Sequence, residues 1–491
     1  MVGKRKKTHW AVRRKTKQAR REGDDGEQKD TDPRPDGRAD RSESVHPGSY
    51  AAQRQRSMET AETAAKPTKR RYGLWVAFCG KDYSGMQMNE GVKTIEAELE
   101  RALFEAGGIA ESNYGFLQKI GWSRAARTDK GVHAAGQLLT AKLHVGDDVE
   151  GFVAKVNVAL PEDIRVMQMV SVTKNFNAKM TCDQRTYEYL APTFIFAKRV
   201  RAAAKGKKEE NATEAAASWP LDLRDSEEGF DNNMVIDNTT LEAHKAFRLK
   251  DETLEQLNTA LQQYIGTHNF HNFTSKMEPS NPQAKRFIIS FEADHPFVQN
   301  GMEWVRLRVV GQSFLLHHIR KMIGTAVEIV SGVTDLSAIE RAMQLTKMDL
   351  PKAPSVGLYL AQAHFEVYNM KMAESIQTSH PPLDLKEPAV AAAVEKFKRD
   401  FIFDHIMKHE ERTRTYAKWL RTMEVLPFDY VAKPYLEWKK EKEEEAARSD
   451  RDGRRELAKA ARAQVTTPAG IATKTPAAET AAEPEKASAS S

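Results

Sequence analysis

The clearest strand and helix patterns of apolar residues lie in two blocks of this chain, residues 71–195 and 235–369. These blocks constrain what the chain can fold into, because their roughly 260 residues are enough for one large core or two fused lobes. The composition agrees, since 40% of the 491 residues are hydrophobic and 29% are charged. Since no apolar run reaches the roughly 18 residues of a membrane helix, we expect no membrane-spanning segment.

The two ends of the chain and the segment between the blocks are polar. Residues 464–491, for example, are mostly Ala, Thr, Pro, Glu and Ser. Such segments cannot bury enough apolar surface to offset the entropy of ordering them. We therefore predict a disordered arm over residues 1–70, a first half of the core over 71–197, a disordered insertion over 198–234, a second half over 235–370, a helical extension over 371–462 and a disordered tail over 463–491.

The first 21 residues contain ten Lys or Arg and no acidic residue. Two basic clusters with a short spacer are typical of a nuclear address or of an arm that contacts RNA. A solvated tail that only aids solubility is the plain alternative. A mitochondrial presequence is disfavoured by the scarcity of serine and by the acidic residues that follow at Glu22, Asp24 and Asp25.

Strand patterns and helix patterns are mixed within each block. Residues 253–265 predict a helix with a capping box formed by Thr253 and Gln256, followed by Gly266. The mixture predicts an α+β fold with a mixed, mostly antiparallel central sheet and flanking helices, built from two pseudo-symmetric halves. The other predicted helices are 94–106 and 315–330, and the predicted strands are 72–79, 135–143, 163–172, 185–190, 287–293 and 304–310.

The spacing of the cysteines and histidines does not match that of metal ligands. The two cysteines, Cys79 and Cys182, are too few for a disulfide scaffold or a four-cysteine zinc site, and they favour a reducing compartment. The pair His268 and His271 has no cysteine at ligand spacing, and neither have the adjacent His317 and His318. We interpret these histidines as ordinary polar and core residues and expect no metal.

The sharpest chemical feature is the segment from Gly121 to Ala135, GWSRAARTDKGVHAA. Its Asp129-Lys-Gly131 sequence predicts a tight turn in which glycine supplies a positive φ, just before a strand. A carboxylate at Asp129 with Arg127 nearby stays ionised at neutral pH, which is the form that a nucleophile or base needs. From turn chemistry alone, an aspartate that caps its own backbone is the more common outcome.

Sequence context adds to this interpretation. The sequence RTDKGVHA around Asp129 resembles the signature loop of the TruA family of pseudouridine synthases, centred on their catalytic aspartate. Six further segments resemble the family's motifs in the same order: Gly80–Gln87, Asn157 with Leu160–Arg165, Phe176–Lys179 with Arg185–Tyr189, Tyr264–Phe270, Gly311–Gly324 and Ala353–Leu360.

Positions at which this sequence differs from bacterial TruA members indicate which branch of the family it resembles. Met86 stands where bacterial members usually carry Trp, Lys130 where they carry Ala, and Asn177–Lys179 where they carry His-Ala-Arg. With the long tails, these residues resemble the eukaryotic multisite tRNA synthases, a nuclear and sometimes mitochondrial group. The resemblance thus implies the nucleus, with the mitochondrion as the alternative.

The resemblance implies a role for each matching residue. Asp129 would act on a uridine flipped out of the RNA, either attacking C1′ or abstracting a proton, and Tyr187 would lie under the uracil. Arg320 would pair with Asp129 and orient it, and Arg127 would support flipping. Leu358 or Leu360 would form a wall of the uracil pocket. The reaction has no redox or hydrolytic step, so no cofactor is required.

The implied partner is RNA, bound in a basic cleft between the two lobes. Lys130, Lys179 and Lys321 are the candidate contacts to phosphates. The implied function is pseudouridine formation at several positions in tRNA, with mRNA or snRNA as a wider range, by a monomer. Two alternatives remain open: a non-catalytic RNA-binding or RNA-folding protein on the same scaffold, and a nuclear partner-docking protein that works through its tails.

Overall fold

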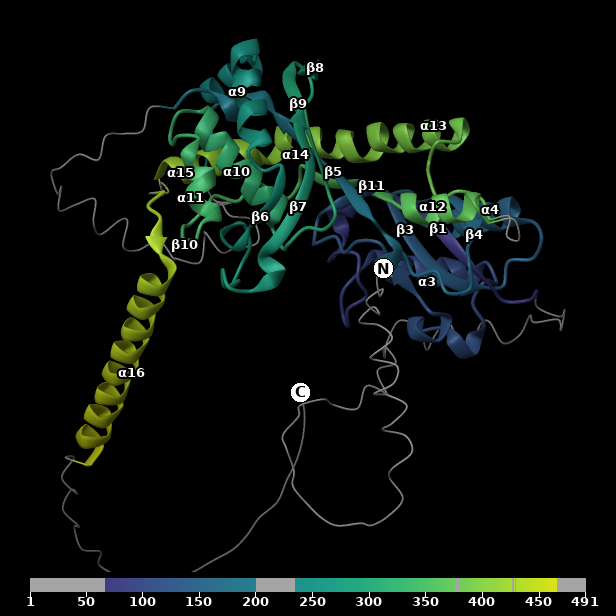
Figure 1. Ribbon diagram of the computed structural model, residues 1–491, viewed down its shortest axis with the longest axis horizontal. Coiled ribbons are helices and arrows are strands. Elements are labelled where there is room, and N and C mark those ends of the chain that lie inside the picture. Colours follow the sequence, from purple (N-terminus) through teal and green to yellow (C-terminus); the bar gives the residue numbers. More distant parts are fainter. Residues whose placement is uncertain (1–66, 200–234, 376–379, 426–427, 429, 466–491) are drawn as a thin grey trace, which may run out of the picture. The chain divides into compact units, whose positions relative to one another are not determined.

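The computed structural model describes residues 67–199, 235–375, 380–425, 428 and 430–465 (Figure 1). Three segments predicted to be disordered therefore fall almost entirely outside the described residues: the N-terminal arm as far as residue 66, the insertion over 200–234 and the tail from residue 466. None of the described helices combines the length and the apolar character needed to cross a membrane.

The first half of the core folds largely as its sequence patterns predict. The N-cap of the helix α3 is Thr94, which accepts a hydrogen bond from the N–H of Ala97. The helix α4 was not predicted, because its valine-rich sequence is also typical of a strand. The elements are β1 (Arg70–Phe78), α3 (Ile95–Glu105), β2 (Ser123–Arg124), β3 (His133–Leu143), α4 (Val149–Ala159), β4 (Ile164–Ser171), α5 (Ala178–Thr181) and β5 (Gln184–Pro192).

In the second half, the predicted capping box at Thr253 and Gln256 is wrong. The helix α9 begins two residues earlier, at Asp251, and its N-cap, Lys250, makes no side-chain cap. Acidic residues in the first turn, Asp251 and Glu252, favour this earlier start because they face the positive end of the helix dipole. The elements are α8 (Asn238–Ala246), α9 (Asp251–Gln262), β6 (Gly266–Asn269), β7 (Lys285–Ala293), β8 (Phe297–Gln299), β9 (Met302–Gly311), α10 (His318–Val330), α11 (Ser337–Met343), β10 (Thr346–Lys347), β11 (Leu358–His364) and α12 (Glu366–Ala373).

One large sheet joins the two halves. Its strands run in the order β4-β1-β3-β11-β5-β9-β7-β6, with β2 added beside β3 and β8 beside β9. Every neighbouring pair is antiparallel except β11 and β3, which are parallel. The predicted α+β class with a mixed, mostly antiparallel sheet is therefore confirmed. The chain halves are interleaved at the centre, because β11 of the second half lies between β3 and β5 of the first.

Helices C-terminal to the core cross the sheet (Figure 1). The helix α13 (Pro388–Phe397) continues through a π-helical turn, Lys398–Phe403, into α14 (Asp404–Thr413), and α15 (Thr415–Val425) follows. Beyond them, β12 (Lys433–Pro434) pairs with β10, and α16 (Tyr435–Val465) lies mostly within the predicted helical extension, residues 371–462.

A buried ionic network joins the π-helical turn to the middle of the sheet. Glu188 on β5 accepts hydrogen bonds from the hydroxyl of Tyr359 and from Nε of Arg308, the latter at 3.0 Å. Nζ of Lys398 lies 3.7 Å from Oε2 of Glu188. Burial alone would raise the pKa of Glu188, but Lys398, Tyr359 and Arg306 outweigh it, so the pKa lies below its usual value. Glu188, Arg306, Arg308 and Lys398 line a cavity of about 570 Å³ beneath α13.

This network predicts a large stability loss in the variant Lys398→Met. The substitution leaves Glu188 buried with one cation fewer, so the free energy of unfolding in urea should fall by about 3 kcal/mol. The control is Lys396→Met, because Lys396 is 71% exposed and pairs with Asp400 at the surface of the same helix. Its effect should stay below about 0.5 kcal/mol. Equal effects of the two substitutions would contradict the role given to Lys398.

Candidate active site

The signature segment, residues 121–135, is held by side chains from neighbouring elements. Oε1 of Gln137 accepts the N–H of Ala126 at 3.0 Å, and Nε2 of Gln137 donates to the Ala126 carbonyl at 2.8 Å. The fully buried Glu96 of α3 forms an ion pair with Arg124. The backbone leading to the predicted catalytic turn is thus tied to the rigid elements α3 and β3.

The turn itself has the predicted geometry. Gly131 has a φ of 76°, in the left-handed region that glycine adopts most readily, and the N–H of Val132 donates to the Asp129 carbonyl at 3.2 Å. The N–H of Met86 donates to the carbonyl of Thr128 at 3.1 Å. Asp129 is exposed. Its backbone is therefore held on both sides while the residue faces solvent.

Tyr187 lies in the middle of β5, next to this turn. It is 8% exposed, and its ring meets the ring of Phe314 edge-on with centroids 5.2 Å apart. Burial raises the pKa of its hydroxyl, Arg185 lowers it, and the charge of Asp129 raises it further. Two conclusions follow: Tyr187 is neutral at physiological pH, and Asp129 lies within its electrostatic reach.

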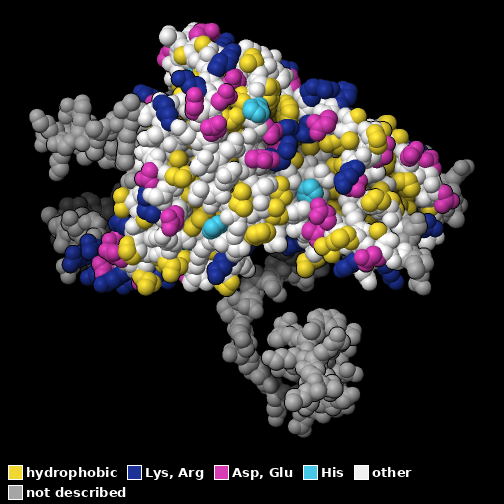
Figure 2. All heavy atoms as spheres, turned by 45° about the horizontal axis from the view of Figure 1, so that its top comes forward, with side chains coloured by type: hydrophobic (Ala, Val, Ile, Leu, Met, Phe, Trp, Pro, Cys, Tyr) yellow, Lys and Arg dark blue, Asp and Glu magenta, His cyan; other side chains and the backbone are white. Residues whose placement is uncertain are grey.

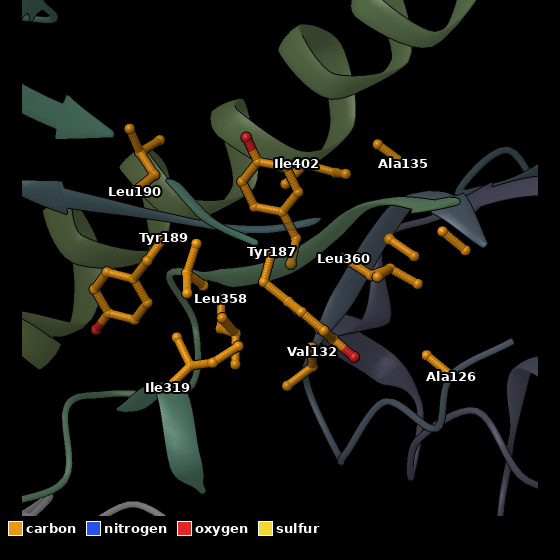
Figure 3. Packing of buried hydrophobic residues seen from close by; sticks show 14 of the residues in the cluster. Ala126, Val132, Ala135, Tyr187, Tyr189, Leu190, Ile319, Leu358, Leu360 and Ile402 are labelled. Carbon is orange, nitrogen blue, oxygen red and sulfur yellow. The ribbon is translucent and has the colours of Figure 1, made fainter. Parts of the chain in front are cut away.

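The two leucines of β11 flank the same tyrosine. Leu360 is paired with Tyr187 in the antiparallel ladder with β5 and with Ala134 in the parallel ladder with β3. Leu358 is paired with Tyr189, two residues further along β5. Figure 3 shows Leu358 and Val132 of the signature segment both close to the Tyr187 side chain. The predicted aromatic platform and apolar wall therefore lie together.

Arg320 reaches this region from the first turn of α10. It is 4% exposed, as its apolar flank predicted, and its Nε donates to the Ala353 carbonyl at 2.6 Å. In turn, the N–H of Ala353 donates to the Arg320 carbonyl at 3.0 Å. The charge of Arg320 acts on Tyr189, whose hydroxyl donates to the Pro354 carbonyl at 2.8 Å. The structure thus places Arg320 beside the strand that carries Tyr187; its pairing with Asp129 stays a prediction.

The remaining predicted side chains lie around this centre or further out. Arg127 and Lys130 are exposed on the signature segment, and Lys179 is exposed on α5. Lys321 is half-buried, and its Nζ donates to the Asn272 carbonyl at 3.2 Å. The face in Figure 2 carries basic and acidic side chains side by side, so it does not display the predicted basic cleft.

His133 contributes to the architecture, a role that sequence reasoning left unassigned. It is fully buried; its Nδ1 accepts the N–H of Gly80 at 2.9 Å, and its Nε2 lies 3.2 Å from the Val356 carbonyl. With Nδ1 as the acceptor, the proton lies on Nε2. Burial, and next the neighbouring His405, lower the pKa of His133 to about 3. The neutral ring therefore joins β1, β3 and the loop before β11.

His268 and His271, the first pair considered for metal binding, face protein oxygen atoms. Nδ1 of His271 lies 3.0 Å from Oδ1 of Asn269, and its Nε2 lies 2.6 Å from the Thr346 carbonyl. Nε2 of His268 lies 2.8 Å from the Ile265 carbonyl. Within the described ranges, no three His, Cys, Asp or Glu side chains form a group that could hold a metal ion.

The buried His133 predicts a specific loss of stability in acid. Its pKa is near 6.5 in the unfolded chain and about 3 in the folded one, so the unfolded chain binds the extra proton between these values. The free energy of unfolding should therefore fall as the pH falls from 6.5 towards 3, by up to about 1.4 kcal/mol per pH unit from this group.

The variant His133→Gln removes the titrating ring, so its unfolding free energy should depend less steeply on pH between about 4.5 and 6.5. Urea unfolding at several pH values measures the slope, and the same substitution at the exposed His295 is the control. Identical slopes for wild type and His133→Gln would refute the assignment.

Comparison with known proteins shows which family this chain resembles. A family model described as tRNA pseudouridine synthase matches residues 260–366, which include Arg320 and both leucines of β11. The chain is 38% identical over 393 residues to the pseudouridylate synthase 1 homolog of Mus musculus, covering 79% of this chain and 81% of that protein. It is 40% identical over 364 residues to the Homo sapiens homolog, covering 73% and 74%.

The similarity extends to fungi. The chain is 34% identical over 381 residues to tRNA pseudouridine synthase 1 of Kluyveromyces lactis, covering 70% of this chain and 68% of that protein. Matches of this length show that the resemblance is not confined to a few motifs. The chain therefore belongs to the TruA family of pseudouridine synthases, in the branch of the eukaryotic pseudouridylate synthase 1 homologs.

Proposed function

We propose that this enzyme converts uridine to pseudouridine at several positions in tRNA, with Asp129 as the nucleophile on a flipped-out uridine. A wider range that includes mRNA or snRNA is part of the proposal. Support comes from the names of the matching family and relatives. The observation that carries it is an exposed carboxylate on a turn held by hydrogen bonds, within electrostatic reach of a buried, neutral tyrosine.

The reaction is an isomerisation, so its atoms and electrons balance within the substrate. The N1–C1′ bond breaks as the Asp129 carboxylate attacks C1′. The uracil turns, and C5 forms the new bond to C1′ as the carboxylate leaves. C5 then loses its proton, and N1 carries one in the product. Proton abstraction by Asp129, without attack on C1′, is the alternative first step.

The neighbouring residues have matching roles in this proposal. Tyr187 provides a flat face for the uracil once the base has left the RNA stack, with Leu358 or Leu360 as the apolar wall. Its neutral hydroxyl adds no charge near the reacting carboxylate. The buried guanidinium of Arg320 needs an anion, and we assign it to Asp129, which it would keep ionised and oriented. Arg127 is exposed on the same segment and supports the flipped state.

We propose that RNA phosphates are bound by basic side chains around this centre, with Lys130 and Lys179 as exposed candidates and Lys321 as a half-buried one. The basic residues 1–21 support location in the nucleus, with the mitochondrion as the alternative. We further propose that the enzyme acts as a monomer. The support is that α13 and the π-helical turn pack over the middle of the sheet.

The variant Asp129→Asn tests the nucleophile. It should lower the rate of pseudouridine formation in unmodified tRNA transcript by at least about 10⁴-fold, because the amide is a poor nucleophile and a poor base. Its affinity for tRNA should stay within about threefold. The matched control is Asp82→Asn, at an exposed carboxylate on the loop after β1, which should keep nearly full activity. A protein that binds tRNA but forms no product even as wild type would instead support the non-catalytic alternative.

The close packing of Gly80 against the signature segment leads to a further prediction. A Cβ added at Gly80 would lie 2.2 Å from the Val132 carbonyl oxygen, so Gly80→Ala must displace the signature segment. A displacement near 1 Å should lower the rate constant by about 100-fold in a folded protein. Gly73→Ala is the control, because its Cβ would meet only flexible side-chain carbons at 3.3 Å or more. Near-normal rates for Gly80→Ala would show that the turn tolerates the shift.

A further inference from the structure

Arg185 begins the matched segment Arg185–Tyr189, but the family resemblance gives it no role of its own. It is on β5 two residues before Tyr187, so the two side chains leave the strand on the same face. Its guanidinium donates to two backbone carbonyls. Nε and Nη2 donate to Ala125 at 3.0 and 2.6 Å, and Nη1 donates to Gln312 at 2.6 Å.

The two carbonyls belong to the segments that carry the predicted catalytic groups. Ala125 precedes Asp129 by four residues, and its own N–H donates to the Leu138 carbonyl at 2.9 Å. Gln312 directly follows β9 and begins the segment that leads through Phe314, the ring against Tyr187, to Arg320. One side chain on the central strand therefore connects the two segments across Tyr187.

The bonding pattern argues against the simplest alternative, in which Arg185 binds an RNA phosphate. All three guanidinium nitrogens of Arg185 already donate to backbone oxygens, and the side chain is half-buried. A cation that contacts phosphate needs its donors directed outward. A planar group with several fixed donors is suited to joining two loops at a defined separation, which a lysine cannot do.

We propose that Arg185 is a positioning residue for the pseudouridylation reaction, holding the Asp129 segment and the Gln312–Arg320 segment at a fixed separation on either side of Tyr187. This inference rests on the proposed function. It assigns Arg185 no contact with the reacting atoms. Its loss lets the two segments separate, so the nucleophile and its orienting arginine are misplaced while the RNA-binding surface is kept.

The test compares Arg185→Gln and Arg185→Lys with wild type on unmodified tRNA transcript, measuring single-turnover rate and tRNA affinity separately. Arg185→Gln should lower the rate about 100-fold, as expected for a misplacement near 1 Å, with affinity unchanged within about threefold. Arg185→Lys can serve one carbonyl at a time, so its rate should fall by roughly tenfold. In Arg185→Ala, added guanidinium at non-denaturing concentration should restore part of the rate.

Two controls separate positioning from general stability. Arg165→Gln removes another arginine that donates to backbone carbonyls, those of Pro161 and Ile164, but on the edge strand β4. It should leave the rate near wild type. Gln312→Ala keeps the accepting carbonyl and should also be near wild type.

Three results would overturn the proposal: a normal rate in Arg185→Gln, an affinity loss that accounts for the whole effect, or an equal rate loss in Arg165→Gln. Asp129→Asn, measured alongside, distinguishes the two claims. Full activity in that variant would sink the assignment of the nucleophile, whereas the comparison of arginine variants would still report on positioning.

Discussion

The pairing of β11 on both of its edges is the constraint on which the rest of the structure depends. This strand, from the end of the second half, is parallel to β3 and antiparallel to β5, so it closes the sheet between two first-half strands. Leu360 is paired at once with Ala134 and Tyr187. Because the strand joins segments far apart in sequence, the site can assemble only after most of the core has folded.

The geometry of the site depends on this position of β11. The loop before β11 supplies the Val356 carbonyl to His133 and the Ala353 carbonyl to Arg320. On the opposite face of the sheet, Glu188 and Lys398 join β5 to the C-terminal helices. Tyr187 thus lies on a strand supported from both faces. The turn that carries the exposed Asp129 can be rigid in such a setting, because its support is distributed over backbone hydrogen bonds.

An element or turn could be predicted from the sequence where its pattern lies within one short stretch of residues. The β-branched and aromatic residues of β1, the alternation in β5 and β9 and the glycine of the Asp129 turn are local signals, and they were predicted. The strand β11 was not, since its sequence LYLAQAH contains no β-branched residue. The capping box failed because several residues can begin a helix where acidic residues precede the expected N-cap.

The residues of the candidate site also fall into two groups, those that a sequence motif predicted and those that only the structure shows. The identity of Asp129, Tyr187 and Arg320 came from motif resemblance, and the structure supplied their surroundings. Arg185 and His133 could not be assigned, because their partners are distant backbone groups. Arg185 has carbonyls 60 and 127 residues away, and His133 has an N–H 53 residues away and a carbonyl 223 residues away. A carbonyl leaves no mark in the sequence, since every residue has one. Supporting residues of this kind become visible only once the fold is known.

An experimental structure of the Asp129→Asn variant bound to an unmodified tRNA substrate would show whether position 129 meets a flipped uridine. We expect one uridine flipped out of the RNA stack, its uracil face on the ring of Tyr187 and its C1′ within about 3.5 Å of the side chain at position 129. Arg320 should lie on the other side of that side chain. A bound uridine that remains stacked in the RNA, or whose C1′ lies far from position 129 while Tyr187 stays uncovered, would contradict this expectation.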